Sequence, residues 1–220
     1  MLNSTAIALP QALQRFVSQF LADVRFYAGL GRARHSGAGL VSTLVRSRGL
    51  WMLTSHRIAY FCMSQRGVRS PVWLIARLCK SVGVGFNVLY CRSQVAEDCE
   101  IAGGAYLSDR GYVFCGALSV GAASLIHDHC TIGQTVARGE GGRPTIGRNV
   151  WIGPDCVIAG PVAVGDGATV LPGTVITFNV PPGAVVKGNP GRIVRTSFDN
   201  SGLRRSLHIV RDVPVETHDT

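Results

Sequence analysis

A six-residue repeat in the second half of the chain constrains the fold more than any other feature. Aliphatic residues recur at every sixth position over residues 146–176, at Ile146, Ile152, Ile158, Val164, Val170 and Ile176. A period of six matches neither the stripe of a helix nor the alternation of a half-buried strand. Hexapeptide repeats build parallel β-helices, in which three short strands complete one triangular coil. The sequence therefore predicts a mainly β protein, with a parallel β-helix of about four to five coils.

The repeat also extends towards the N-terminus, with two interruptions. Aliphatic residues six apart occur at Val95, Ile101, Leu107 and Val113, and after a step of seven they resume at Val120, Ile126 and Ile132. The step from Ile132 to Ile146 is fourteen, and the Gly-rich segment GQTVARGEGGRPT fills it. Breaks in a regular repeat map to loops, often on the working face. We therefore expect residues 137–144 to protrude from the coil.

The regions on either side of the repeat have a different character. The spacing of apolar residues predicts helices over 10–29, 50–65 and 71–82, with the solenoid beginning near 83–90. Residues 196–220 have the composition of a loosely held polar tail, in which 207–210 could add a short strand. The expected organisation is a helical region over 1–88, a β-helix domain over 89–195 and a C-terminal tail over 196–220.

Charge is distributed unevenly along the chain, whose net charge is +9. Residues 1–93 contain 12 Lys and Arg against one acid, Asp23, whereas residues 94–220 contain 10 against 12. A basic first half could face a membrane surface or an anionic acceptor, or it could be an ordinary solvated surface. No nucleic-acid-binding motif accompanies the charge, so we expect no nucleic-acid partner.

Targeting and cysteine signals point to one compartment. No apolar run reaches the roughly 18 residues of a membrane span, and the N-terminus does not have the pattern of a signal peptide. The seven cysteines are odd in number and include no CxxC pair, so neither a disulfide framework nor a metal site is expected. Reduced, buried cysteines in a cytoplasmic protein are the favoured interpretation.

The repeats, together with the closing segment Gly188-Asn189-Pro190-Gly191-Arg192-Ile193-Val194, resemble the hexapeptide-repeat acyltransferases, which have a left-handed β-helix. Within that superfamily, residues 141–166 look most like the serine acetyltransferases and the exopolysaccharide O-acetyltransferases. The resemblance covers roughly residues 90–195. It implies an acetyl-CoA-dependent O-acetyltransferase that acts on a saccharide, an exopolysaccharide precursor or a serine-like acceptor. It further implies a homotrimer, with CoA in the groove between neighbouring solenoids and no metal.

The chain departs from this family at the catalytic histidine. Such enzymes use a histidine as general base because a hydroxyl must lose its proton as it attacks. On the simplest alignment with the family, the base position is Asp109, and a second family histidine is replaced by Arg143. Among the six histidines, His127 and His129 lie within the repeats, whereas His56 lies in a predicted helix and is expected to be a packing or surface residue.

The two repeat histidines have a favourable expected position. His127 directly follows Ile126, so both histidines should lie in a turn and point outward. Counting back three repeats stacks Ser108 near His127, Asp109 near Asp128 and Arg110 near His129, and counting forward through Ile146 puts 147–149 at the same corner. A carboxylate that orients an imidazole is the usual arrangement of a general base. The candidate catalytic residues are therefore His127, His129 and Asp109, and the candidate substrate-binding residues are Arg110, Asp128 and Arg143. One alternative is that the two exposed turn histidines have no function. Another is that the acceptor amine or hydroxyl needs no strong base and is positioned by Asp109 or Arg143.

Further residues are implicated in CoA binding by the resemblance. Lys187 and Arg192 occupy the end of the solenoid where basic groups meet the CoA phosphates in relatives. Gly153, Ala159 and Gly160 flank the expected path of the pantetheine arm, where small residues permit close approach. Trp151 should point outward, towards a subunit interface or the adenine.

Two other functions remain open. The missing family histidine would also suit a non-catalytic scaffold or regulatory protein derived from such an enzyme. A γ-type carbonic anhydrase would need three zinc-binding histidines, of which the repeats contain at most two.

Overall fold

The computed structural model describes residues 9–29, 46–64, 71–133 and 142–210. Its first helices are α1 (Leu9–Gly29), α3 (Arg48–Ser64) and α4 (Pro71–Phe86), and α4 continues into a π-helical turn, η1 (Asn87–Cys91). The three helices predicted from apolar spacing are confirmed. The last one is longer than expected, and because the first strand begins at Gln94, the start predicted within 83–90 was wrong. Within the described ranges, no helix is both long enough and apolar enough to cross a membrane.

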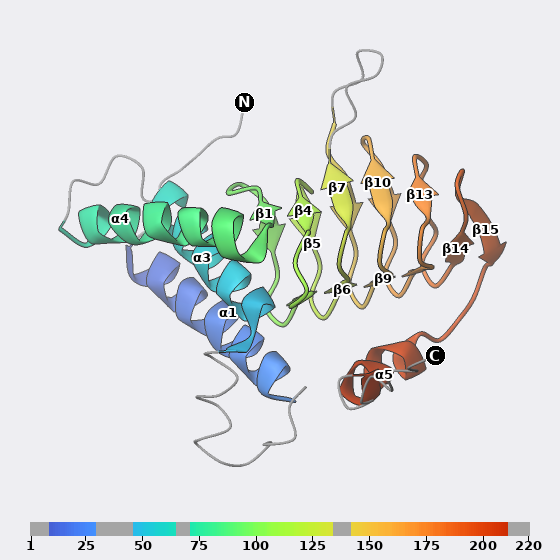
Figure 1. The fold of residues 1–220 in the computed structure, drawn as a ribbon, viewed down its shortest axis with the longest axis horizontal. Coiled ribbons are helices and arrows are strands. Elements are labelled where there is room, and N and C mark those ends of the chain that lie inside the picture. Colours follow the sequence, from blue (N-terminus) through green and yellow to red (C-terminus); the bar gives the residue numbers. More distant parts are fainter. Residues whose placement is uncertain (1–8, 30–45, 65–70, 134–141, 211–220) are drawn as a thin grey trace, which may run out of the picture.

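The rest of the chain forms a parallel β-helix with three faces (Figure 1). One face is a five-stranded sheet of β1 (Gln94–Val95), β4 (Phe114–Cys115), β7 (Thr131–Gly133), β10 (Val157–Ala159) and β13 (Val175–Ile176). The second is a four-stranded sheet of β2 (Glu100–Ile101), β5 (Ser119–Val120), β8 (Thr145–Ile146) and β11 (Ala163–Val164). The third is a six-stranded sheet of β3 (Tyr106–Leu107), β6 (Leu125–Ile126), β9 (Trp151–Ile152), β12 (Thr169–Val170), β14 (Val185–Lys187) and β15 (Arg192–Arg195).

The repeat aliphatics fill the interior, as predicted. Ile126, Ile152 and Val170 are aligned in register in the six-stranded sheet and have 0% exposure. Each such side chain contributes roughly 1.5–3 kcal/mol by leaving water. In the five-stranded sheet, Cys115, and not Val113, aligns with Val95 and Ile132. The repeat position predicted at Val113 was therefore wrong, because the turn between β3 and β4 contains additional residues.

The first strand of the six-stranded sheet would be an open edge without the N-terminal helices. The Tyr27 hydroxyl of α1 donates a hydrogen bond to the carbonyl of Leu107 at 2.7 Å and accepts one from the Leu107 N–H at 2.9 Å. The first turn of α3 also approaches closely: a Cβ on Gly49 would lie 1.9 Å from the Leu107 carbonyl oxygen. The helices thus cover an edge that could otherwise pair with another strand.

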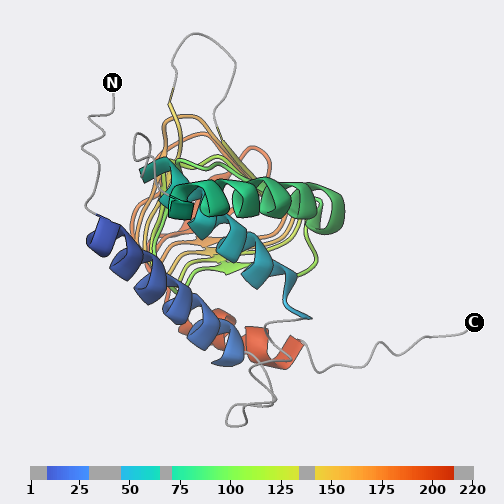
Figure 2. The same cartoon turned by 90° about the vertical axis from the view of Figure 1, so that its left-hand side faces the viewer.

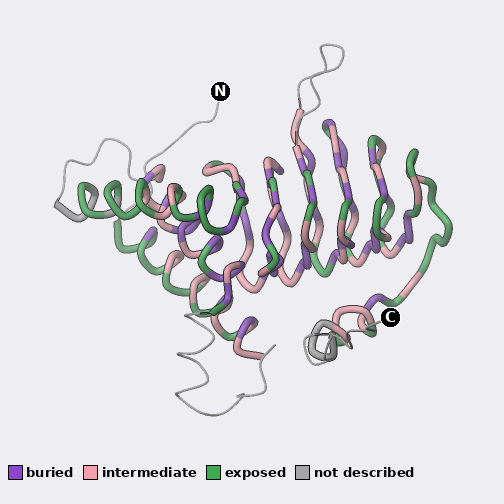
Figure 3. Tube along the Cα trace, in the orientation of Figure 1, coloured by how far each residue is buried: buried purple, intermediate pink, exposed green. Residues whose placement is uncertain are grey.

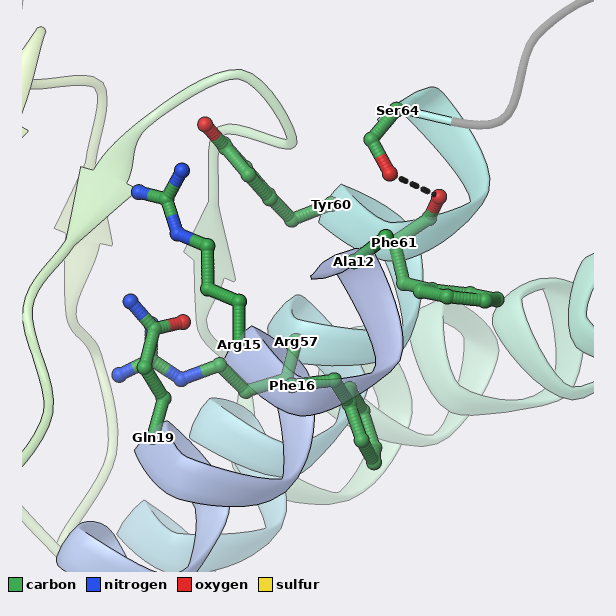
Figure 4. A pocket seen from close by; sticks show the side chains of 8 residues that line it. All are labelled: Ala12, Arg15, Phe16, Gln19, Arg57, Tyr60, Phe61 and Ser64. Carbon is green, nitrogen blue, oxygen red and sulfur yellow. Dashed lines mark hydrogen bonds between the residues drawn. The ribbon is translucent and has the colours of Figure 1, made fainter. Parts of the chain in front are cut away.

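A buried ion pair fixes α1 and α3 to the first coil. Arg57 donates its Nε–H to Asp23 at 3.1 Å and also donates to the carbonyls of Ile101 and Ala102. Figure 4 shows a pocket between the two helices, with Arg15, Gln19 and Arg57 on one side and Phe16 and Phe61 on the other. Because Arg57 also donates to Gln19 and Arg15 pairs with Glu100, the polar side of this pocket is a structural seam.

The C-terminal end of the solenoid is closed differently. Strand β15 pairs antiparallel with β14, and the chain then returns to the outside of the six-stranded sheet as α5 (Ser201–Val210) (Figure 1). Asn200 holds this return by donating to the carbonyls of Asn149, at 2.8 Å, and of Gly167, at 3.1 Å. The short strand considered for residues 207–210 was wrong, since these residues continue the helix.

Candidate functional site

Two edges of the solenoid contain the residues singled out by the sequence. We call the turns that follow β3, β6, β9 and β12 the histidine edge, and the turns that follow β4, β7 and β10 the loop edge. Strand register places Ser108, His127, Gly153, Leu171 and Lys187 in one row along the histidine edge, one per coil. The loop edge includes residues 134–141, which lie outside the described residues, as does most of the loop predicted over 137–144.

His127 is half-buried on the histidine edge, in contact with two aromatic rings. Its imidazole lies 5.0 Å from the ring of Trp151 and 6.1 Å from that of Tyr106, measured between centroids. Its Nε2 is buried and has no hydrogen-bond partner among the described residues. Burial lowers the pKa of His127, Arg110 lowers it further, and Asp128 opposes both. His127 is therefore a neutral imidazole at pH 7, less exposed than the sequence suggested.

His129 is the exposed imidazole of the edge and is flanked by two carboxylates. Its Nδ1 lies 3.7 Å from Asp128 Oδ2 and 3.6 Å from Asp155 Oδ1, and its side chain is 51% exposed. The ring of Tyr112 stacks on it with centroids 4.9 Å apart. His129 has a left-handed backbone, with φ of +55°, which is uncommon outside glycine, asparagine and aspartate. No hydrogen bond joins its Nε2 to a described side chain.

The stacking predicted for this corner is correct for Ser108 and His127, and wrong for Arg110 and for residues 147–149. Leu107 and Ile126 are aligned, so Ser108 and His127, which directly follow them, are neighbours in the row. The Ser108 hydroxyl lies 3.4 Å from Asp128 Oδ1. Tyr112, and not Arg110, is the partner of His129, because the turn after β3 is longer than the turn after β6. The next coil contributes Pro154 and Asp155, and not residues 147–149, because β6 aligns with β9.

Asp109 has a structural partner. Its Oδ1 accepts a hydrogen bond from the N–H of Gly49 at 2.9 Å, in the first turn of α3. The first N–H groups of a helix have no partner within the helix, and a carboxylate there is stabilising. The geometry therefore accounts for Asp109 as the N-terminal cap of α3.

Arg143 lies on the loop edge, away from the histidines. It donates from Nε to the carbonyl of Gly116 and from Nη2 to that of Ala117, each at 2.6 Å, and pairs with Asp98. These bonds tie the strand after the loop to the two preceding coils. They use the same donors that would otherwise bind a substrate.

The predicted CoA-binding residues are divided between the two edges. Lys187 lies three coils from His127 in the same row, about 14 Å away at the usual strand spacing, and Arg192 is its antiparallel partner. Gly153 lies between them, where a Cβ would meet the Trp151 ring at 2.9 Å. Ala159 and Gly160 lie on the loop edge, and Gly160 has φ of +94°. One chain thus aligns His127, Gly153 and Lys187, and leaves Ala159 and Gly160 apart.

Sequence reasoning missed three residues of the histidine edge. Asp155 and Tyr112 flank His129, and Arg92 donates to the Tyr112 hydroxyl at 2.6 Å while its guanidinium lies over the same ring. A correct alignment of strands β6 and β9 would have found Asp155. No signal in the sequence indicates Tyr112, because it lies in the lengthened turn.

A metal site receives no support from the geometry. Over the described ranges, no group of three or more His, Cys, Asp or Glu side chains is arranged to hold a metal ion. Nothing in these ranges therefore favours the zinc-dependent alternative.

Comparison with known proteins places the repeat in a defined family. A family model described as "Bacterial transferase hexapeptide (six repeats)" matches residues 143–177. Serine acetyltransferase of Synechococcus elongatus is 28% identical over 156 residues, which are 68% of this chain and 58% of that protein. Galactoside O-acetyltransferase of Escherichia coli is 37% identical over 73 residues, which are 33% of this chain and 34% of that protein. The chain thus spans about three fifths and one third of the lengths of these two relatives.

A solved structure matches most of the chain. The serine acetyltransferase of Neisseria gonorrhoeae superposes with a TM-score of 0.66 and 21% identity, covering 86% of this chain and 70% of that one. At this identity the likeness concerns the fold. The fold is a left-handed parallel β-helix with N-terminal helices, as predicted.

Proposed function

We propose that the chain is a hexapeptide-repeat acyltransferase, an acetyl-CoA-dependent O-acetyltransferase whose chemistry takes place on the histidine edge; the family match over residues 143–177 and the similarity to serine acetyltransferase support this proposal. The acceptor is a hydroxyl of a saccharide, an exopolysaccharide precursor or a serine-like molecule. The names of the relatives, serine acetyltransferase and galactoside O-acetyltransferase, support this range.

The observation that carries the proposal is the cluster around His129. Asp128 and Asp155 lie 3.7 and 3.6 Å from its Nδ1, so they favour the tautomer with the proton on Nδ1 and leave Nε2 as the base. These distances are longer than a hydrogen bond, and catalytic contacts often tighten only when substrate is bound. His127, whose Nε2 is buried, holds the turn and lines the acceptor side.

The roles of the chain's residues follow from this geometry. Acetyl-CoA supplies the acyl group as a thioester. His129 Nε2 takes the proton from the acceptor hydroxyl as its oxygen bonds to the acyl carbon, and the carbon–sulfur bond breaks. The imidazolium then returns that proton to the departing sulfur, so the products are the O-acetyl ester and the free CoA thiol. Backbone N–H groups in the turns are available to stabilise the negative charge on the acyl oxygen.

The charged end of the row fits the CoA phosphates. Lys187 and Arg192 are exposed on paired strands, about 14 Å from His127 along the row. Cations with several N–H donors suit phosphate groups. Between His127 and Lys187 the row consists of Gly153 and Leu171, so the row itself carries no charged side chain there.

A homotrimer would complete the site. Ala159 and Gly160 lie on the loop edge, so they can line the same groove as the histidine edge only if they come from a neighbouring chain. Phe114 and Leu118, which are 46% and 48% exposed, support self-association of the solenoid. Size-exclusion chromatography with light scattering should give about 70 kDa, three times the 23.4 kDa chain. A monomer would contradict the trimer. All seven cysteines are free thiols, which supports a cytoplasmic location.

Release of CoA thiol tests the activity. The protein is incubated with acetyl-CoA and a panel of sugars and serine, and free thiol is followed. The variant His129→Asn keeps a residue that tolerates the left-handed turn, and it should lower kcat by about 10²- to 10⁴-fold. Ala123→Asn, also at a left-handed position with φ of +56°, is the matched control on another edge. Full activity of His129→Asn would refute its role, and absence of CoA binding by calorimetry would leave a scaffold as the function.

A further inference from the structure

Helix α4 turns its small and polar side to the protein and its apolar side outward. Gly83 and Asn87 lie against α3: a Cβ on Gly83 would approach the Ser55 Cβ to 2.9 Å, and the Asn87 amide donates to the Ser55 hydroxyl. The outer side carries large aliphatic residues, each 64–67% exposed, at Leu74, Ile75, Leu78 and Val82. Figure 3 shows most of α4 in the colour of exposed residues. An ordinary surface helix has the opposite arrangement, with its apolar stripe towards the core.

An aromatic rim that includes an arginine continues this apolar surface. Leu89, in the π-helical turn, is 82% exposed. Beside it, Phe86 stacks on Tyr90 at 4.8 Å and contacts Trp51 at 5.9 Å, and the Arg48 guanidinium lies 4.6 Å above the Tyr90 ring. Aromatic rings and arginine combine an apolar body with a polar tip, so they suit the boundary between hydrocarbon and headgroups. We call Leu74, Ile75, Leu78, Val82 and Leu89, with this rim, the α4 face.

The charge around the α4 face is positive. Its described cations are Arg48, Arg77 and Lys80, and Lys80 pairs with Glu97 of the first coil. The described N-terminal helices contain a single acid, Asp23. Asp23 is 1% exposed and paired with Arg57, so the described N-terminal helices expose no carboxylate. Such a surface attracts anionic groups and repels a second copy of itself. Charge therefore favours a negatively charged partner over another copy of this chain.

We propose that the α4 face docks the protein on the surface of an anionic lipid bilayer. A helix of 16 residues is about 24 Å long and contains Arg77 and Lys80, so α4 lies in the plane of the interface and does not span it. An apolar face beside basic residues is the pattern of interfacial helices. Figures 1 and 2 show α4 at the first coil, with β15 at the opposite end of the solenoid, so docking leaves the Lys187 end away from the bilayer.

Vesicle flotation with the full chain tests this inference. The protein should float with vesicles of phosphatidylcholine mixed with phosphatidylglycerol, but not with phosphatidylcholine alone, and added salt should weaken binding. The double variant Leu78→Gln with Val82→Gln should lower the partition coefficient about tenfold or more. Leu13→Gln, at a residue that is 53% exposed on α1, is the matched control and should bind as the wild type does.

Three results would overturn the proposal. The first is no flotation with anionic vesicles at low ionic strength. The second is undiminished binding by the double variant and by Leu89→Gln, which tests the same face independently should the double variant fail to fold. The third is a wild-type assembly larger than a trimer that the double variant breaks down, because this would assign the α4 face to contacts between copies. None of these readouts depends on acetyl transfer, so they separate this proposal from the enzymatic one.

Discussion

Removing the Tyr27 hydroxyl should destabilise the protein at the junction between α1 and the solenoid. Tyr27 is fully buried and makes two hydrogen bonds to one residue, to the Leu107 carbonyl at 2.7 Å and from the Leu107 N–H at 2.9 Å. In Tyr27→Phe both backbone groups lose this partner on a strand that has no neighbour on that side. Each unsatisfied buried group costs about 1–3 kcal/mol. We therefore expect the free energy of unfolding to fall by about 2–5 kcal/mol.

Urea unfolding followed by circular dichroism measures this loss. The matched control is Tyr112→Phe, which removes a hydroxyl that accepts a bond from Arg92 in an exposed position, and it should cost less than about 0.5 kcal/mol. The expected signature is a lower midpoint for Tyr27→Phe with an unchanged slope, since the surface exposed on unfolding is the same. If Tyr27→Phe were no more sensitive to urea than Tyr112→Phe, the hydroxyl would not be the group that caps the edge strand.

Three further changes have defined outcomes. Burial, and then Arg57, lowers the pKa of His56 from 6.5 to about 4. Between these pH values the unfolded state therefore binds more protons than the folded state, so the free energy of unfolding should fall by about 3 kcal/mol as the pH drops from 6.5 to 4. Urea unfolding should show this loss for the wild type and not for His56→Leu. Asp109→Ala should cost about 1 kcal/mol through loss of the α3 cap and leave kcat within about twofold, whereas a hundredfold loss of kcat with unchanged stability would make Asp109 catalytic. Lys187→Ala should raise the KM for acetyl-CoA about tenfold at constant kcat, and a kcat effect alone would contradict phosphate binding.

The interior of the solenoid was predictable because its sequence code is local. A strand of two or three residues has one inward position, and only an apolar side chain fits there, so the period of six identifies Ile152 or Val170 directly. The code fails where a turn changes length. Val113 and Cys115 are both buried, and spacing alone could not decide which of them aligns with Val95.

The candidate site was harder to predict because it depends on contacts between distant segments. The positions of His127 and His129 could be placed on an edge, but Tyr112 and Asp155 reach His129 only through the register of three coils. Gly49 and Asp109 are 60 residues apart, and no local pattern reveals that one caps the other. Similarly, the apolar spacing of α4 predicted a helix without indicating that its apolar side faces away from the protein.

The contact between Asp109 and α3 explains why the imidazoles of His127 and His129 lie one coil later than Asp109, the base position that the resemblance implied. The turn after β3 is lengthened, and its carboxylate is occupied by the N–H of Gly49, so this turn is covered by the first turn of a helix. The next turn, after β6, is the first on the histidine edge that no described helix caps, and it contains His127, Asp128 and His129. A base at this position lies about 5 Å nearer to Lys187 than one at Asp109 would. In the proposed site, an acceptor beside His129 would therefore lie one coil closer to Lys187 than an acceptor beside Asp109 would.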